Sequence, residues 1–147
     1  MFGCKFYPSH IFSPCNPNIT FGLLFWGQVS TGVGGLAKFD DTNWTVYDTS
    51  NSGLPNNYIE SISIDSNGIK WIGTDGGGLA KYNDTTWVVY DSSNTSMTDN
   101  SILILTTEEN GNLWIGSWRG GLINFDKINW NIYTVFNSDL TDNNIKT

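Results

Sequence analysis

A chain of 147 residues with 14% aromatic and only 14% charged residues can form one domain with a substantial core, and it carries too much ring surface for a disordered tail. Its formal net charge is −7 and its few basic residues are scattered singly, so we expect no nucleic-acid partner. No apolar run approaches the roughly 20 residues that cross a bilayer, so we expect no membrane span in this chain.

Residues 1–25 show no repeat and are expected to form a separate N-terminal segment. Its apolar stretches are broken by Pro, Ser and Asn, and the later run FGLLFW is short and lacks a small-residue cleavage site, so we predict no export signal in this chain. Cys4 and Cys15 lie in this segment, where two free thiols are favoured over one local disulfide. His10 is the single histidine, which leaves little room for histidine-dependent chemistry.

Residues 26–147 carry a tandem repeat with a period of 43 residues. Large apolar, aromatic and glycine residues recur at this step without a gap. The recurring sets are Leu36, Leu79 and Leu122; Trp44, Trp87 and Trp130; Tyr47, Tyr90 and Tyr133; and Gly35, Gly78 and Gly121.

One period contains four short strand patterns separated by turns. The first, YIESISI at 58–64, alternates apolar and polar residues, with a slip of one position that a bulge would absorb. The others are IKWIGT at 69–74, LAKYN at 79–83 and TWVVYD at 86–91. The sequences DSNG at 65–68 and DGGG at 75–78 supply turn residues, and a polar link at 92–100 leads to the next period.

Four strands in each period match one blade of a β-propeller, whose repeats are about 40 to 50 residues long. No helical periodicity is long enough to predict a helix. The predicted fold is all-β, with about three four-stranded antiparallel blades in an incomplete propeller. LTDNNIKT at 140–147 matches the first strand of a further blade. Because a ring needs at least about four blades, the chain is interpreted as a fragment of a larger protein or, less favoured, as a module that identical chains complete.

The repeated residues have a structural interpretation. Neighbouring blades cover both faces of a blade, so its strands must offer large apolar groups at fixed positions, and paired glycines allow close approach of backbones. The residues predicted to pack between blades or to shape the turns are Trp44, Trp71, Trp87, Trp114, Trp130, Gly78, Gly121, Leu79 and Leu122.

Two of the repeats resemble a known family. DSNGIKWIGTDGGGLAKYN and EENGNLWIGSWRGGLINFD are similar to the two-component regulator propeller repeat, with an acidic residue, a glycine, LWIGT, a glycine pair, Leu and an aromatic-Asp ending. The first repeat keeps Gly34, Gly35 and Leu36, but Gln28 stands where the motif Trp belongs.

The resemblance implies seven-bladed propellers, usually in pairs, that form the periplasmic sensor part of hybrid two-component histidine kinases. It therefore implies a periplasmic or extracellular location, a role in signal transduction and, as a partner, the rest of a larger sensor protein. Since many such sensors detect breakdown products of polysaccharides in gut bacteria, it also makes a saccharide the candidate ligand.

Carboxylates at Asp40, Asp65, Asp75, Glu108 and Asp126 could by type serve a glycosidase, which needs two of them about 5 to 9.5 Å apart across a cleft. Most recur at turn positions, and one copy per blade indicates a structural role. SIDSNGIKW is similar to the Asp-box turn of sialidase-type propellers, which is a folding element, and DSNG lacks the downstream Glu of a calcium loop. We therefore predict no enzymatic activity, no metal and no cofactor.

The third repeat departs from the second at Trp118 and Arg119, which replace Asp75 and Gly76. Arg119 is the sole arginine of the chain. Tryptophan faces stack on sugar rings and arginine binds carboxylates with a bidentate fork, so one hypothesis places both residues on a face that binds an acidic saccharide. The alternative, which the sequence favours, is that Trp118 covers the neighbouring blade and Arg119 caps a local carboxylate.

The preferred function is ligand sensing by a non-enzymatic propeller fragment of a two-component regulator type sensor. Two alternatives stay open. The first is a self-assembling structural or protein-interaction module, and the second, weaker one is a carbohydrate-active enzyme on a propeller scaffold.

Overall fold

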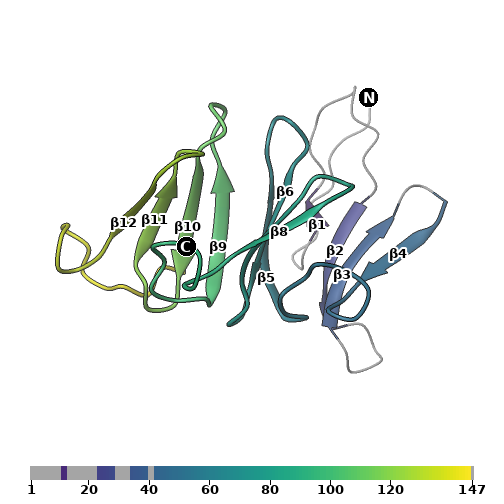
Figure 1. Cartoon of the computed structure of the whole chain (residues 1–147), viewed down its shortest axis with the longest axis horizontal. Helices are drawn as coiled ribbons and strands as arrows, with labels where there is room; N and C mark the ends of the chain where they lie inside the picture. The colour runs from purple at the N-terminus through teal and green to yellow at the C-terminus, as the bar shows by residue number, and fades with distance from the viewer. Residues whose placement is uncertain (1–10, 13–22, 29–33, 40–41, 147) are drawn as a thin grey trace.

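A computed structural model describes residues 11–12, 23–28, 34–39 and 42–146 of the chain. Within these ranges the chain forms three four-stranded antiparallel sheets and no helix, which confirms the all-β prediction (Figure 1). The described residues therefore include no helix of the length and apolarity that a membrane span requires. Four candidate residues lie outside the described residues, namely Cys4, His10, Cys15 and Asp40.

The first sheet contains β1 (Ile11–Phe12), β2 (Leu23–Gln28), β3 (Gly34–Phe39) and β4 (Trp44–Tyr47), hydrogen-bonded in chain order. Strand β1 and the first three residues of β2 belong to the segment 1–25, which shows no repeat in its sequence. The first blade thus draws two of its strands from a region where the 43-residue pattern is not visible.

The register of β2 explains why the repeat fades there. Leu24 lies opposite Lys38, which is the position that Trp71 holds in the second sheet. The spacing had placed Gln28 at this position, but β2 is offset along β3, and Gln28 pairs with Gly34 instead. Trp26, which stands two residues before Gln28, pairs with Leu36, so neither residue takes the place of the motif tryptophan in the sheet.

The second sheet contains β5 (Ile59–Ile64), β6 (Lys70–Thr74), β7 (Gly78–Tyr82) and β8 (Trp87–Tyr90). These bounds agree with the four strand patterns to within two residues. The expected slip in the first pattern is present as a register shift between Ile59 and Ser61. The bulge keeps Ile59 and Ile62 buried in one cluster, with Ile64 packed against it.

The third sheet contains β9 (Ile102–Thr107), β10 (Leu113–Ser117), β11 (Leu122–Phe125) and β12 (Trp130–Tyr133). It repeats the second sheet strand by strand, including a register shift between Gly116 and Ser117 where β10 pairs with β9. The repeat in sequence is thus a repeat of one four-stranded meander.

The three sheets lie side by side, and each first strand packs on the preceding sheet (Figure 1). Strand β5 contacts β2 and β3, and β9 contacts β5 and β6. We call the contact between the first and second sheets the first seam, and that between the second and third sheets the second seam. A buried apolar cluster fills each of them.

The same kind of aromatic contact occurs in each seam. In the first seam the Tyr47 ring packs on Trp87 with centroids 5.7 Å apart, and in the second Tyr90 packs on Trp130 at 5.3 Å. The tyrosine ends the outermost strand of one sheet, and the tryptophan begins the outermost strand of the next. Each of these tryptophans also stacks on an aromatic ring of its own sheet, at 4.1 Å on Tyr82 and 4.3 Å on Phe125.

Glycines permit the close approach of successive sheets. A Cβ atom at Gly73 would lie 2.6 Å from Cγ2 of Ile102, the first residue of β9, which is closer than van der Waals contact allows. Gly78 and Gly121 have φ of 86° and 83°, a left-handed conformation that favours glycine. Leu79 is fully buried in the second seam, whereas Leu122 is half-buried.

Candidate ligand-binding face

Two kinds of loop meet at one edge of the second and third sheets. The Gly78 N–H donates to the Asn100 carbonyl at 2.8 Å, and the Gly121 N–H donates to the Asn143 carbonyl at 3.0 Å. Each bond ties the turn between the second and third strands of a blade to the polar link that follows the blade. We call the edge formed by residues 56–58, 75–78, 91–101, 117–121 and 134–145 the loop edge.

Trp118 and Arg119 lie on the loop edge, directly after β10. The Trp118 N–H donates to the Ser101 carbonyl at 3.0 Å, and the Arg119 N–H donates to Oδ2 of Asp99 at 2.6 Å. The Trp118 side chain is 49% exposed. In the described part of the chain no carboxylate forms an ion pair with the Arg119 guanidinium. Backbone bonds thus fix the turn while both side chains keep access to solvent.

A carboxylate and a hydroxyl group lie beside this turn. The Ser101 hydroxyl donates to Oδ1 of Asp75 at 2.9 Å, and the Asp75 N–H donates to the Tyr58 carbonyl at 3.0 Å. The Tyr58 side chain is 56% exposed. Hydrogen bonds therefore connect the four residues Tyr58, Asp75, Ser101 and Trp118 across two blades. Sequence reasoning selected Trp118 but missed two residues: Tyr58, which opens the first strand pattern at 58–64, and Ser101, a small polar residue directly after the link at 92–100.

Together with Arg119, these four hydrogen-bonded residues offer two exposed aromatic rings, one carboxylate, one hydroxyl group and one guanidinium. Rings of this kind stack on the apolar faces of flat or ring-shaped ligands, and the polar groups can bind hydroxyl or carboxylate substituents. Among the described residues no cluster of three or more His, Cys, Asp or Glu could hold a metal ion.

The other candidate carboxylates belong to turns. Asp65 accepts the N–H groups of Asn67 and Ile69 at 2.9 and 3.0 Å, and Asp126 accepts that of Asn129 at 2.7 Å. The last bond is the main cause that lowers the pKa of Asp126. These oxygens hold the turns in place, as expected for acidic residues that recur once per blade.

Glu108 differs from its repeat equivalent Asp65 in what it binds. Its Oε1 accepts the indole N–H of Trp114 at 2.7 Å, and this bond is the main cause that lowers the pKa of Glu108. Asp65 is one methylene group shorter, and the indole Nε1 of Trp71 is buried without a hydrogen-bond partner in the described structure. At this repeat position, the tryptophan indole N–H thus has a hydrogen-bond acceptor in the third blade and none in the second.

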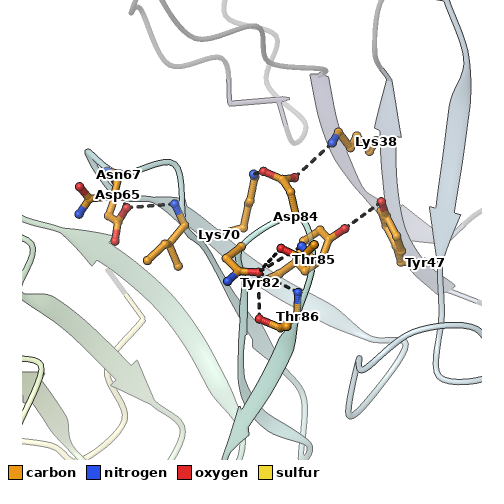
Figure 2. A network of polar contacts seen from close by, with 11 residues as sticks. Lys38, Tyr47, Asp65, Asn67, Lys70, Tyr82, Asp84, Thr85 and Thr86 are labelled. Carbon is orange, nitrogen blue, oxygen red and sulfur yellow. Dashed lines mark hydrogen bonds and ion pairs between the residues drawn. The ribbon is translucent and has the colours of Figure 1, made fainter.

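A polar network crosses the first seam, and sequence reasoning missed it (Figure 2). Asp84 accepts hydrogen bonds from Lys70 in its own sheet and, at 3.2 Å, from Lys38 in the first sheet. Next to it, the hydroxyl groups of Tyr47 and Tyr82 lie 3.3 Å apart. Lys70 is only 2% exposed, so its charge requires this carboxylate. In the sequence, the one sign of this network was the lysine in the otherwise apolar strand KWIGT.

The ionisation of this network follows from its geometry. Partial burial opposes ionisation of Asp84, but the hydrogen bonds from Lys70 and Lys38 outweigh it and lower the pKa of the carboxyl group. Burial, followed by the hydrogen bond with Tyr47, raises the pKa of Tyr82. Asp84 is therefore a carboxylate and Tyr82 a neutral phenol at neutral pH.

The remaining predicted packing residues occupy different environments. Trp71 is 4% exposed in the second seam, and Trp87 and Trp130 lie half-buried in the first and second seams. Trp114 is half-buried and stacks on Tyr133 of its own sheet. Trp44, on the outermost strand of the first sheet, is 57% exposed.

Comparison with known proteins agrees with the fold. Residues 53–76 match the family model described as two component regulator propeller, so the second blade carries the repeat recognised in the sequence. The chain is also similar, at 23% identity and a TM-score of 0.66, to the extracellular domain of a hybrid two component system protein from B. thetaiotaomicron. That match covers 86% of this chain and 17% of the other, so the chain spans only a small part of that protein. No curated protein matches the chain.

Proposed function

We propose that this chain, which carries the two component regulator propeller repeat, is part of the ligand-sensing propeller of an extracellular or periplasmic two-component sensor. Three observations support the proposal: the family match in the second blade, the propeller fold shared with an extracellular domain, and the exposed aromatic and polar groups of the loop edge. Asp65, Glu108 and Asp126 bind groups in and beside their own turns, and Asp84 binds the lysines of the first seam, which favours binding over catalysis.

The proposed ligand class is an acidic saccharide, bound at the loop edge. The observation that carries this proposal is the exposed pair Trp118 and Arg119, held by backbone bonds to Ser101 and Asp99. The tryptophan face would stack on a sugar ring, and the guanidinium would bind a carboxylate substituent with two parallel hydrogen bonds. Tyr58 offers a second ring, and the Asp75 and Ser101 side chains offer polar partners for hydroxyl groups.

The test is calorimetric titration of the chain with a panel of neutral and uronic-acid oligosaccharides. Replacing Trp118 with Ala should weaken binding of every ligand about 10-fold or more, since a central aromatic contact is removed. Replacing Arg119 with Ala should weaken only the uronic-acid ligands. Ile128→Ala is the matched control, because Ile128 is an exposed residue in the β11–β12 turn, at the opposite edge of the same sheet.

Two results would contradict the proposal. One is unchanged saccharide affinity in the Trp118→Ala chain together with a lower melting temperature, which would give Trp118 a packing role. The other is equal loss of neutral and acidic ligands in the Arg119→Ala chain, which would remove the reason for an acidic ligand.

A further inference from the structure

Two turns outside the loop edge contain an Asn-Gly pair. Asn67 and Gly68 lie between β5 and β6, and Asn110 and Gly111 lie at the same repeat position between β9 and β10. Both asparagines are exposed. An asparagine that precedes glycine can deamidate without an enzyme, because glycine has no side chain to hinder attack by its own backbone nitrogen. Both pairs are therefore candidates for this modification.

The reaction takes place within the dipeptide. The backbone nitrogen of the glycine loses its proton and attacks Cγ of the asparagine side chain, and the side-chain nitrogen leaves as ammonia. The succinimide that forms then takes up one water molecule and opens to aspartate or isoaspartate. Water is consumed and ammonia is released, so no other reactant is needed. Since the side chain must rotate until Cγ reaches the glycine nitrogen, hydrogen bonds that hold its amide slow the reaction.

In the third blade, the Asn110 side chain is held at both ends of its amide. Nδ2 donates to Oε2 of Glu108 at 2.8 Å, and Oδ1 accepts the N–H of Asn112 at 2.8 Å. The backbone carbonyl of Asn110 also accepts the Lys127 ammonium at 2.6 Å. A Cβ atom at Gly111 would lie 2.7 Å from Cε of Lys127, so the lysine side chain packs directly on this glycine.

In the second blade, the corresponding groups bind elsewhere. Oδ1 of Asp65 accepts the N–H of Asn67 at 2.9 Å and that of Ile69 at 3.0 Å. The N–H that the asparagine side chain accepts in the third blade thus binds the aspartate here. The residue that corresponds to Lys127 is Asp84, which binds lysines of the first seam. Within the described residues, the side-chain amide of Asn67 has no hydrogen-bond partner.

The attacking nitrogen is held alike in the two turns. The N–H groups of Gly68 and Gly111 each donate to the carbonyl three residues earlier, at 2.9 Å, and both glycines are left-handed, with φ of 78° and 84°. The turns therefore differ in how the asparagine side chain is held. We propose that Asn67 is a site of spontaneous deamidation in the folded chain, and that the hydrogen bonds of its turn protect Asn110.

The product affects the first seam. Isoaspartate adds one bond to the backbone between Asn67 and Gly68, and it leaves a negative charge in the turn. That turn leads directly to the buried Lys70, and it joins β6 to β5, which packs on the first sheet. The lengthened turn disturbs both, so the deamidated chain, separated by anion exchange, should melt at a lower temperature than the original chain.

The first measurement follows both asparagines in one sample. The chain is incubated at mildly alkaline pH, and its proteolytic peptides are quantified by mass spectrometry over time. In the folded chain, Asn67 should deamidate about 5-fold or more faster than Asn110, an effect the size of one hydrogen bond. In the chain unfolded in guanidinium chloride, the two sites should react at similar rates, because the bonds that protect Asn110 are lost.

A pair of substitutions in the third blade tests the cause. Glu108→Ala removes the acceptor of the Asn110 amide and should raise the Asn110 rate toward that of Asn67. Glu109→Ala is the matched control, because Glu109 is an exposed neighbour of the same charge and, within the described residues, no hydrogen bond joins it to Asn110. Circular dichroism checks that each variant is folded. If Glu108→Ala unfolds the chain, the comparison of folded and unfolded wild type decides by itself.

Four results would overturn the proposal. Equal rates in the folded chain would show that the turns do not differ in reactivity. The same ratio of rates in guanidinium chloride would assign the difference to neighbouring residues in the sequence. An unchanged Asn110 rate in folded Glu108→Ala would show that its hydrogen bond does not protect. An unchanged melting temperature of the product would remove the effect on the first seam. None of these results depends on ligand binding at the loop edge.

Discussion

The two seams of this chain have the same backbone and different chemistry. In the first, Lys70, Tyr82 and Asp84 contribute polar groups, and Lys38 reaches across from the neighbouring sheet (Figure 2). One period later, the corresponding residues of the third blade are Leu113, Phe125 and Lys127. Leu113 and Phe125 belong to the buried apolar cluster of the second seam.

The comparison shows which features a blade must keep. Both seams retain the tyrosine on tryptophan contact, and in the second seam Gly73 leaves room for Ile102. The groups that fill the rest of the seam can be ionic or apolar. A buried ion pair gains little net stability over a well-packed apolar substitute, but it becomes costly when one partner is removed. The first seam should therefore be the more sensitive to single substitutions.

The largest expected effect comes from Asp84→Asn. Asparagine tolerates the left-handed φ of 70° at this position, so the backbone is preserved while the buried Lys70 loses its counter-charge. We expect a loss of about 3 kcal/mol in the free energy of unfolding, measured by urea denaturation. Asp126→Asn is the control, since it also removes a turn carboxylate but lies away from the first seam. Equal losses in the two variants would contradict the account.

The next effect concerns the close approach in the second seam. Gly73→Ala forces its Cβ against Ile102, and we expect a loss of about 2 kcal/mol from overpacking. Gly76→Ala is the comparison, because a Cβ there meets nothing within 4 Å, although its φ of 75° adds backbone strain. The melting temperatures should place Gly73→Ala below Gly76→Ala. The reverse order would mean that the sheets are not as closely packed as described.

A smaller gain is expected from Asp65→Glu in the second blade. The longer side chain would give the buried indole N–H of Trp71 the partner that Glu108 gives Trp114. A buried donor that gains a hydrogen bond should raise the free energy of unfolding by about 1 kcal/mol. The reciprocal change, Glu108→Asp, should lower it by a similar amount. If Asp65→Glu destabilises the chain, the turn cannot release the bonds that Asp65 makes to Asn67 and Ile69.

The pH dependence gives the smallest but most specific effect. The folded chain holds the pKa of Asp84 below its ordinary value of 3.8, so this group contributes stability above that pH and loses it as the pH falls through the folded pKa. The difference in stability between wild type and Asp84→Asn should therefore be constant near neutral pH and shrink below about pH 4. If this difference in stability is unchanged down to pH 2.5, the contacts with Lys70 and Lys38 do not stabilise the ionised form of Asp84.

Much of the fold could be predicted from the sequence because its signals are local. The turn sequences, the alternation in YIESISI and the fixed period indicate where the strands lie. The bulge after Ile59 follows from the slip of one position in that alternation of apolar and polar residues. The first sheet was harder, because β2 is offset and Leu24 takes the place of the tryptophan. The pairing of Lys70 with Asp84 and Lys38 could not be predicted, since it depends on which side chains meet across the seam.

The candidate site was predicted only in part. Trp118 and Arg119 stood out because they break a repeat of small residues, and both lie on the loop edge. Tyr58 and Ser101 gave no such signal, because their contribution depends on hydrogen bonds between links and turns that are distant in sequence. Residues that deviate from a repeat can be found in the sequence, whereas the neighbours that complete a surface require the structure.

The most direct test of the central claim is a double-mutant cycle on Lys70 and Asp84. We expect Asp84→Asn alone to lower the free energy of unfolding strongly. Lys70→Leu introduces the residue that the third blade has at this position, and in a chain that carries it Asp84→Asn should change the free energy of unfolding very little. The coupling in the free energy of unfolding should then be about 2 kcal/mol or more. Additive losses, with the double variant as unstable as the sum of the single ones, would contradict the claim that the ionic and apolar seams are interchangeable.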